Sequence, residues 1–258
     1  MIRLFTTCFP ESNPVRAAEF TEALRRNVAC SPIGEICVLA ETEVPPVSRS
    51  AKLRVRKVQG RPMYEDYIRW INELATTDDF SVIANADIFF DDGLDVLRKT
   101  RMKSGTAFAL SRWDVETNGK ALLYDHNDSQ DSWVFRGRVE GVRADFLIGV
   151  PRCDNRFMKE LELAGYEVLN PSFSLRSFHL HAGSRATYPV EPEAVFVPPP
   201  YGYKWPHNLW PLYRTLLHNV THPAARVSWR FDSRLWRRKL KVHWIERAVH
   251  TSIFRRKY

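Results

Sequence analysis

Several carboxylates follow an apolar segment at residues 80–84 (FSVIA). Asn85, Ala86 and Asp87 come directly after it, and Asp91 and Asp92 follow shortly afterwards. Ligands of open α/β sheets bind at the carboxyl ends of strands, where a hard oxygen ligand such as Asp87 could hold Mg²⁺ or Mn²⁺ against a diphosphate. The simpler interpretation is that the aspartates only end a strand and cap the next helix. This segment alone leaves both interpretations open.

A second group of candidates lies later in the chain. Asp154 is placed near the start of a predicted helix, where the dipole favours an ionised carboxylate, so it suits either a general base or a plain N-cap. His179 and His181 are alternate residues of a predicted strand and so point to the same face. Two histidines on one face near a strand end suit a site at the sheet edge, and His181 is the favoured metal ligand.

The elements that must position these residues alternate between strands and helices. Strands are predicted at residues 2–9, 34–40, 53–58, 80–84, 106–111, 133–136, 144–148, 166–169 and 175–181, and a long loop at 114–132. Helices are predicted to start at Asn13-Pro14 and Pro62, and to span 93–100 and 154–164, with Gly165 ending the last. This order predicts an α/β domain with a mostly parallel sheet.

Absent motifs narrow the function classes. The chain has no G-x-G-x-x-G after its first strand, no G-x-x-x-x-G-K-[ST] and no G-x-S-x-G. These absences argue against a dinucleotide site, a P-loop NTPase and a hydrolase nucleophile elbow. Four cysteines without a C-x-x-C pair favour a reduced cytosolic protein, although four could also pair as disulfides.

The residues Asn85, Ala86 and Asp87 stand where glycosyltransferases of the GT-A fold carry their D-x-D motif. The resemblance extends through residues 61–67 (RPMYEDY), 129–133 (SQDSW), 149–155 (GVPRCDN) and 177–181 (SFHLH), and it covers roughly residues 1–190. The chain resembles a bacterial group of such enzymes associated with surface-polysaccharide synthesis. Because Asn85 replaces the first Asp of the motif, binding of Mn²⁺ or Mg²⁺ would depend on Asp87.

The resemblance implies roles for particular residues. Binding of the nucleotide and its diphosphate falls to Thr6, Thr7, Phe9, Arg16, Arg61, Tyr64, Asn85, Ala86 and Asp87. Binding of sugar falls to Gln130, Asp131, Trp133 and Asn155, with Trp133 presenting an apolar face to a ring. Asp154 would deprotonate the acceptor, with Asp131 as the second candidate for the base. His181 would lie near the leaving group and would bind the metal ion together with Asp87.

Charge is distributed unevenly along the chain. The net charge is +8, yet residues 204–258 hold 13 Lys and Arg against 2 Asp and Glu, together with five of the eight Trp. We therefore expect a near-neutral body followed by a basic, aromatic, helical tail. Such a tail fits an anionic membrane surface, fits nucleic acid less well, or is simply a solvated subdomain.

The predicted organisation is a GT-A-like domain at residues 1–190, a Pro-rich linker or lid at 191–203, and the tail at 204–258. The N-terminus lacks the features of a signal peptide and no segment is long and apolar enough to span a bilayer. We expect a cytoplasmic protein, peripheral on the inner face of the cell membrane.

The expected function is transfer of a sugar, with inversion, from a nucleotide-sugar to a glycan or lipid-linked acceptor. A UDP-sugar is the favoured donor. The alternative is a non-catalytic scaffold or binding protein that the basic tail recruits to membrane or nucleic acid, and Asn85 keeps it open. A sugar nucleotidyltransferase is a third possibility, against which the missing Gly-rich loop near the first strand counts.

Overall fold

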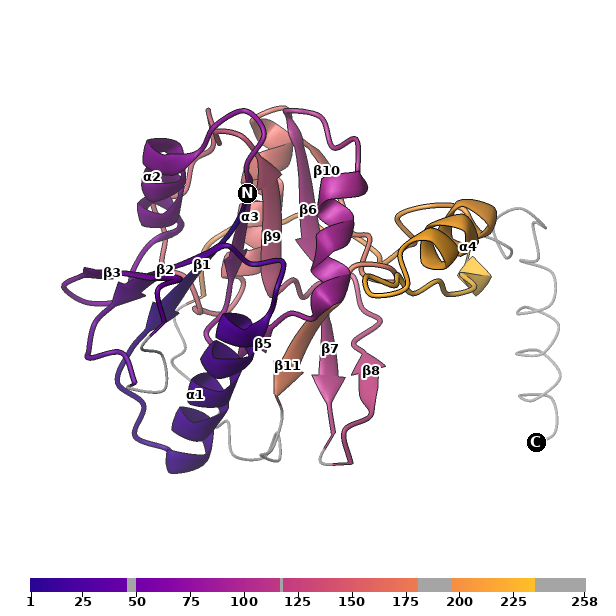
Figure 1. Cartoon of the computed structure of the whole chain (residues 1–258). Coiled ribbons are helices and arrows are strands. Elements are labelled where there is room, and N and C mark those ends of the chain that lie inside the picture. The colour runs from indigo at the N-terminus through magenta and orange to yellow at the C-terminus, as the bar shows by residue number, and fades with distance from the viewer. Residues whose placement is uncertain (46–49, 117, 181–195, 235–258) are drawn as a thin grey trace, which may run out of the picture.

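The computed structural model describes residues 1–45, 50–116, 118–180 and 196–234 (Figure 1). Seven strands form the main sheet in the order β10-β6-β9-β4-β1-β2-β3. Their bounds are β1 (Ile2–Cys8), β2 (Glu35–Ala40), β3 (Leu53–Lys57), β4 (Phe80–Ala84), β6 (Thr106–Leu110), β9 (Ser132–Arg136) and β10 (Glu167–Leu169). Neighbouring strands pair in parallel, except that β9 runs antiparallel to β4 and β6.

Helices cover both faces of this sheet (Figure 1). They are α1 (Pro14–Ala29), α2 (Tyr64–Leu74), the 3₁₀ helix η2 (Asp92–Lys99) and α3 (Cys153–Leu163), whereas α4 (Leu212–Thr221) stands at one side of the body. Alternate strand residues point to opposite faces, so Leu4 and Val82 pack with α1 and η2, whereas Phe5 and Ile83 pack with α2 and α3. The predicted α/β fold, a mostly parallel sheet flanked by helices, is confirmed.

A smaller sheet lies beside the main one, in the order β5-β11-β7-β8. Its strands are β5 (Ile88–Phe89), β7 (Arg112–Val115), β8 (Ala121–Leu123) and β11 (Ser177–Leu180). The prediction of a long loop over 114–132 is therefore wrong. Strand β7 pairs with the distant β11 and is half-buried along its length, so it has no local alternation of apolar residues to reveal it.

A strand predicted at residues 144–148 is also absent. Leu147 makes one isolated bridge to Met63, and Ala144 and Ile148 are buried in the core beneath α2. These apolar residues fill the core without joining a ladder, and an apolar run alone does not distinguish the two situations. Helix α2 begins at Tyr64, two residues after Pro62, because Met63 is extended and its N–H donates to Asp66 at 2.8 Å.

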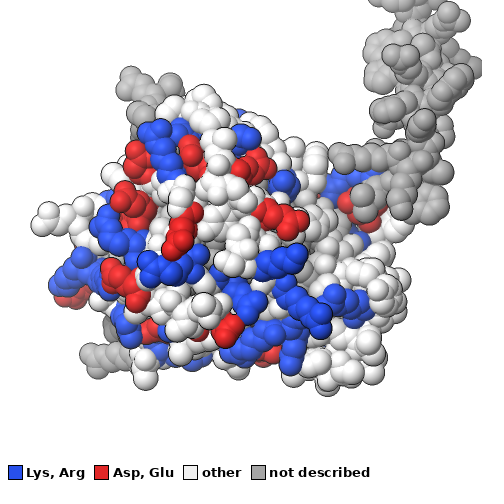
Figure 2. Space-filling model, turned by 90° about the horizontal axis from the view of Figure 1, so that it is seen from above, with Lys and Arg blue, Asp and Glu red and all other residues white. Residues whose placement is uncertain are grey.

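The amino-terminal edge of the parallel strands carries basic side chains interspersed with acidic ones (Figure 2). At this edge Arg136, the last residue of β9, pairs with Asp78 at 2.7 Å, and Arg138 pairs with Glu140 at 3.2 Å. The charges of these arginines are therefore balanced locally, far from the carboxyl ends of the strands.

Residues 196–234 pack against the body. Val197 joins the core on the α2 and α3 side, and Trp210 and Val227 join the core on the α1 and η2 side. The predicted domain boundary at 190, His181 and the part of the predicted helical tail beyond Arg234 lie outside the described residues. Within the described part of the chain, no helix is both long and apolar enough to cross a membrane.

Candidate functional site

A cleft of about 710 Å³ opens at the carboxyl ends of β1 and β4. It is lined by Thr7, Phe9, Glu11, Ser12, Asn13, Arg16, Phe20, Glu41, Arg61, Asn85, Ala86, Asp87, Ile148 and Gly149. The structure thus brings together the residues predicted to bind nucleotide, with the exception of Thr6 and Tyr64. A cleft of this size holds an ordinary small-molecule ligand.

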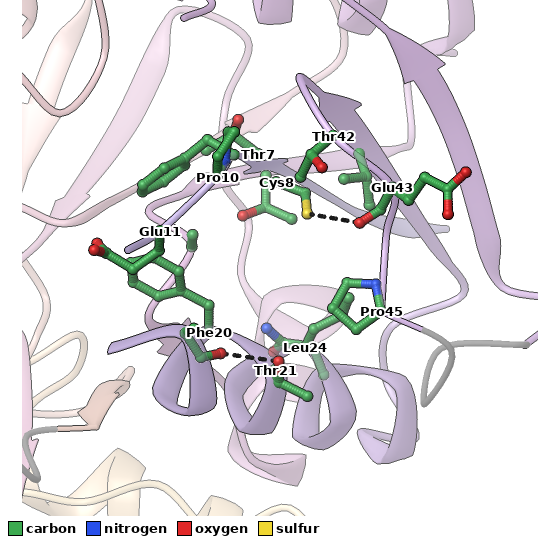
Figure 3. Close-up of a pocket in the computed structure, with 16 residues that line it drawn as sticks. Thr7, Cys8, Pro10, Glu11, Phe20, Thr21, Leu24, Thr42, Glu43 and Pro45 are labelled. Atoms are coloured by element: carbon green, nitrogen blue, oxygen red, sulfur yellow. Dashed lines mark hydrogen bonds between the residues drawn. The ribbon is translucent and has the colours of Figure 1, made fainter. Parts of the chain in front are cut away.

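A side cavity of about 180 Å³ adjoins the cleft between β1 and α1 (Figure 3). Thr7 and Cys8 approach it from β1, and Phe20 and Leu24 approach it from α1. Thr6 also lines it, while Thr7, Phe9 and Phe20 line both spaces. The cavity is therefore a narrow, mostly apolar extension of the cleft.

Helix α1 positions the first cation of the cleft. Asn13 caps the helix by accepting from the N–H groups of Val15 and Arg16, at 3.0 and 3.4 Å, and Pro14 occupies the first helical position. The first turn thereby directs Arg16 to Glu11 at 3.2 Å and to Asp87 at 3.9 Å. This cap is therefore a local feature of the sequence that fixes where a charge lies in the cleft.

A second cation borders the cleft beside two aromatic rings. The Arg61 guanidinium lies 5.8 Å from the centre of the Phe9 ring, and Arg16 lies 5.2 Å from that of Phe20. Phe9 and Phe20 contact each other with ring centroids 5.0 Å apart. Cations beside a polar cleft attract phosphate groups, and guanidinium matches their geometry.

Asp87 lies in the cleft opposite His179. His179 Nε2 is 3.3 Å from Asp87 Oδ2, and its Nδ1 is 2.9 Å from Asp114 Oδ1. Burial alone would lower the pKa of His179, but hydrogen bonds and charges from Asp114 and Asp87 raise it to about 9. Burial would raise the pKa of Asp87, and the bond and charge of His179 with the charge of Arg16 outweigh it, so that pKa is lowered. The pair is therefore ionic at neutral pH.

Asp87 and His179 could hold a divalent cation that a diphosphate also binds. The carboxylate and the imidazole Nε2 face each other, and Asp114 orients the ring as outer carboxylates orient ligating histidines. A cation there would replace the proton on Nε2. Within the described residues, no group of three or more His, Cys, Asp and Glu side chains could hold a metal ion by itself. Phosphate oxygens and water would have to complete the coordination.

Asn85 contributes to a different contact. Its Nδ2 donates to Asp131 Oδ1 at 3.0 Å, and its backbone N–H donates to the carbonyl of Asp131 at 3.2 Å. Arg112 holds the other carboxylate oxygen of Asp131 at 3.1 Å and reaches Asp114 at 2.9 Å. Asn85 therefore connects the cleft to Asp131, and Arg112 joins Asp131 to the group around His179.

Asp154 sits in the first turn of α3, beside this network. Its Oδ2 accepts the backbone N–H of Gln130 at 3.2 Å. Burial, then the nearby charge of Asp131, raise the pKa of Asp154 from 3.8 to about 6, against the backbone hydrogen bonds that favour the charged form. A carboxylate with a pKa near 6 is mostly ionised at neutral pH, yet it binds a proton more readily than an ordinary carboxylate. It is therefore suited to general base catalysis.

The residue before α3 has an unusual backbone. Arg152, the N-cap, has φ of +70°, a left-handed conformation that costs a non-glycine residue roughly 1 kcal/mol. Cys153 follows it, and its N–H donates to the carbonyl of Val150. This tight turn places Asp154 at the helix N-terminus.

Four predicted residues are placed differently. Trp133 is 1% exposed and packs edge-on against Phe157, and Tyr64 is 1% exposed and stacks on Phe157 at 4.1 Å. Because successive side chains of β9 point to opposite faces of the sheet, Trp133 points into the core between the sheet and α3. It therefore offers no face to a sugar. Asn155 and Gln130 are also buried, and their side-chain amides donate to backbone carbonyls. All four act in packing or loop structure, not in the cleft.

Sequence reasoning misses Arg112, Asp114 and the position of His179. Arg112 and Asp114 belong to β7, at the edge of the segment predicted as a loop, and the sequence favours His181 over His179. The alternation of the two histidines is the available signal, but it does not say which strand end faces Asp87. That pairing comes from β11 running beside β5 and β7.

No protein-family model matches the sequence, and no curated protein matches it. Among solved structures, the chain is similar to the mannosyltransferase PcManGT from Pyrobaculum calidifontis in complex with GDP-Man and Mn²⁺. The TM-score is 0.47 at 13% identity, over 72% of this chain and 58% of that one. It is similar to S. aureus TarS 1-349 in complex with UDP-GlcNAc, with a TM-score of 0.48 at 10% identity, over 74% and 62% of the two chains.

A third solved structure is the Francisella tularensis 2-C-methyl-D-erythritol 4-phosphate cytidylyltransferase (IspD). Its TM-score is 0.44 at 10% identity, over 72% of this chain and 96% of that chain. The chain spans about three fifths of the length of the mannosyltransferase and of TarS 1-349.

Proposed function

We propose that the protein transfers a sugar from a nucleoside-diphosphate sugar to a hydroxyl group of an acceptor. The observation that carries this proposal is the position of Asp154 and Asp87. A carboxylate suited to removing a proton lies next to Asp131, and Asn85 joins Asp131 to a cleft that holds Asp87 and cations. Glycosyl transfer by single displacement needs a base and a stabilised leaving group. Asp154, which is outside the lining of the cleft, would supply the base, and the cleft with Asp87 and its cations would stabilise the leaving group.

The donor would occupy the cleft and its side cavity. The narrow, mostly apolar cavity between β1 and α1 suits the flat base of a nucleotide, and the cleft suits the diphosphate. Arg16 and Arg61 would contact phosphate oxygens, because both border the cleft. We expect a uridine nucleotide, and the panel below tests this base against others.

Asp154 would act on the acceptor. Its carboxylate accepts the proton of the acceptor hydroxyl as that oxygen forms a bond to the anomeric carbon. The bond from that carbon to the diphosphate oxygen breaks on the opposite face, so the configuration inverts. The nucleoside diphosphate leaves with the electron pair, and Arg16 and protonated His179 balance its charge. A divalent cation held by Asp87 and His179 would, when bound, supply this charge stabilisation in place of the proton on His179.

Nucleotide binding is tested by thermal unfolding of the full chain with UDP, GDP, CMP or dTDP, each with and without Mn²⁺. A ligand present at about 100 times its Kd adds about 2.7 kcal/mol, a readable shift. With Mn²⁺ present, we expect one nucleotide to stabilise the wild type and not D87N, because Asp87 would hold the cation that the diphosphate binds. The control D78N removes the carboxylate of Asp78, which is 82% exposed at the opposite edge of the sheet. No stabilisation by any nucleotide overturns the proposal and leaves the scaffold interpretation.

Catalysis is tested with the sugar conjugate of the nucleotide that binds. Release of the nucleoside diphosphate, without or with an acceptor glycan, indicates a transferase, because a scaffold leaves the donor intact. A nucleotidyltransferase would release pyrophosphate from a nucleoside triphosphate and a sugar phosphate. Proton NMR of the product gives the anomeric configuration, and a retained configuration would exclude Asp154 as the base of a single displacement.

A further inference from the structure

Helix α4 presents its apolar side chains to solvent. Its exposed apolar residues form one continuous face at helical spacing: Leu212 (45%), Tyr213 (75%), Leu216 (55%), Leu217 (65%) and Val220 (79%). The residues that it buries are Thr215 and His218, at 1% and 7% exposure. A surface helix normally buries its apolar stripe and exposes its polar one. In α4 the opposite holds, since the apolar side chains are exposed and the polar side chains of Thr215 and His218 face the body. Its apolar face therefore lacks a counterpart within the described chain.

This orientation is held in place by specific contacts. His218 Nε2 lies 2.9 Å from the carbonyl of Ala225, and Asn219 exchanges two hydrogen bonds with Val227, at 2.9 and 2.8 Å. Trp210, just before the helix, is buried in the core, with the guanidinium of Arg214 4.6 Å from its ring. Because the polar face is anchored, the helix cannot rotate to bury its apolar face without breaking these bonds.

The chain that contains α4 is basic in sequence. Residues 196–234 hold five Lys or Arg residues and a single acidic residue, Asp232. Three of these cations are paired with carboxylates of the body, Lys204 with Glu162 and both Arg230 and Arg234 with Asp125. Residues 235–258, which lie outside the described residues, add eight Lys or Arg and one Glu. In the view of Figure 1, α4 stands at one side of the body, away from α1 and α2. A second copy of this chain would bring one positive region against another, whereas an anionic bilayer would attract both the charge and the apolar face.

We propose that α4 is an interfacial helix that docks the protein on an anionic lipid bilayer. The apolar face formed by Leu212, Tyr213, Leu216, Leu217 and Val220 enters the boundary between headgroups and acyl chains, and neighbouring cations bind the headgroups. The sequence predicts a membrane contact in the basic tail as a whole, and this proposal assigns a specific face to it. The proposal does not depend on sugar transfer.

The test compares full-length wild type with L216S/L217S in flotation with vesicles of phosphatidylcholine and phosphatidylglycerol at a ratio of about 7:3, an anionic surface of the kind that attracts basic segments. The exposed positions of both leucines mean that the variant should fold, and its thermal unfolding checks this. The control is L163S, since Leu163 is 62% exposed at the end of α3 on another part of the protein. We expect L216S/L217S to bind vesicles at least about tenfold more weakly, and L163S to bind as wild type. Pure phosphatidylcholine vesicles should bind all three proteins weakly.

Two results would overturn the proposal. If L216S/L217S binds the anionic vesicles as tightly as wild type, the basic tail binds without α4. If wild type is a dimer by light scattering, the variant is a monomer and vesicle binding is equal, the apolar face is a contact between copies. The nucleotide-dependent thermal shift of L216S/L217S should match that of wild type, so that failure here and failure of the proposed function remain separate outcomes.

Discussion

At the scale of single residues, the burial of Asp154 affects both its suitability as a base and the stability of the fold. Its pKa in the folded protein is about 6, above the ordinary 3.8, and burial is the main cause. The folded state therefore binds more protons than the unfolded state between these values, and stability falls as the pH rises through this window. A shift of about two pKa units corresponds to about 3 kcal/mol at neutral pH. This carboxylate destabilises the fold at the pH where it would serve as a base.

The substitution D154N should change stability and activity in opposite directions. The amide that this variant carries is uncharged and can still accept the N–H of Gln130, so we expect it to be more stable than wild type by up to about 3 kcal/mol at neutral pH, with the two proteins converging near pH 4. Sugar transfer should fall by about 10²- to 10⁴-fold. Urea unfolding at both pH values measures the first effect. The control D92N removes a carboxylate at the start of η2. If Asp154 only stabilised the start of α3, D154N would be less stable than wild type but would keep its activity.

The same pKa sets a pH dependence for catalysis. As the pH falls through about 6, Asp154 becomes protonated in the free enzyme and can no longer accept a proton. The value of kcat/KM should therefore fall about tenfold per pH unit below that point and reach a plateau above it. A profile of kcat/KM from about pH 4.5 to about pH 8 measures this, with unfolding at each pH as the control. A flat profile down to about pH 5 would remove Asp154 from the role of base.

At the scale of elements, the N-terminus of α1 connects a local signal to the cleft. The N13A substitution leaves the N–H groups of Val15 and Arg16 without their cap and should cost about 1 kcal/mol of stability. Because Arg16 lies in that first turn, N13A should also weaken nucleotide binding. N13D retains an accepting oxygen and should keep most of the stability. Urea midpoints and nucleotide titrations of the three proteins measure both effects. Equal binding by N13A and wild type would mean that Arg16 reaches the cleft without the cap.

This helix also shows what sequence could and could not supply. Asn13 and Pro14 mark a helix start through bonds within three residues, so the start of α1 was predictable. The carboxyl end of β4 was predictable for a similar reason, since an apolar run ends in Asn85. By contrast, β7 and β11 pair although more than 60 residues separate them in the chain, as the contact of Asp114 with His179 shows. No local sequence pattern predicts that pairing, and none predicts the core packing that directs Trp133 away from the cleft.

At the scale of the whole molecule, charge and packing divide the chain differently. Net charge changes sharply near Lys204, which suggests a separate tail. Yet Trp210 and Val227 lie in the same core as Leu94 and Phe108, on one face of the main sheet. If the residues from 204 to 234 belong to that core, their loss should destabilise the whole domain in one transition.

Two tryptophans of residues 204–234, one buried and one exposed, provide the test. Trp210 is 8% exposed in the core, so W210A should lower the free energy of unfolding by about 3 to 5 kcal/mol. Trp205 is 43% exposed beside Arg234 at 4.6 Å, so W205A should cost about 1 kcal/mol through the lost cation–π contact. Urea unfolding followed by circular dichroism should give one transition for each protein, with an unchanged slope. If W210A instead split the curve into two transitions, residues 204–234 would unfold as a unit of their own, and the boundary in charge would also be a boundary in stability.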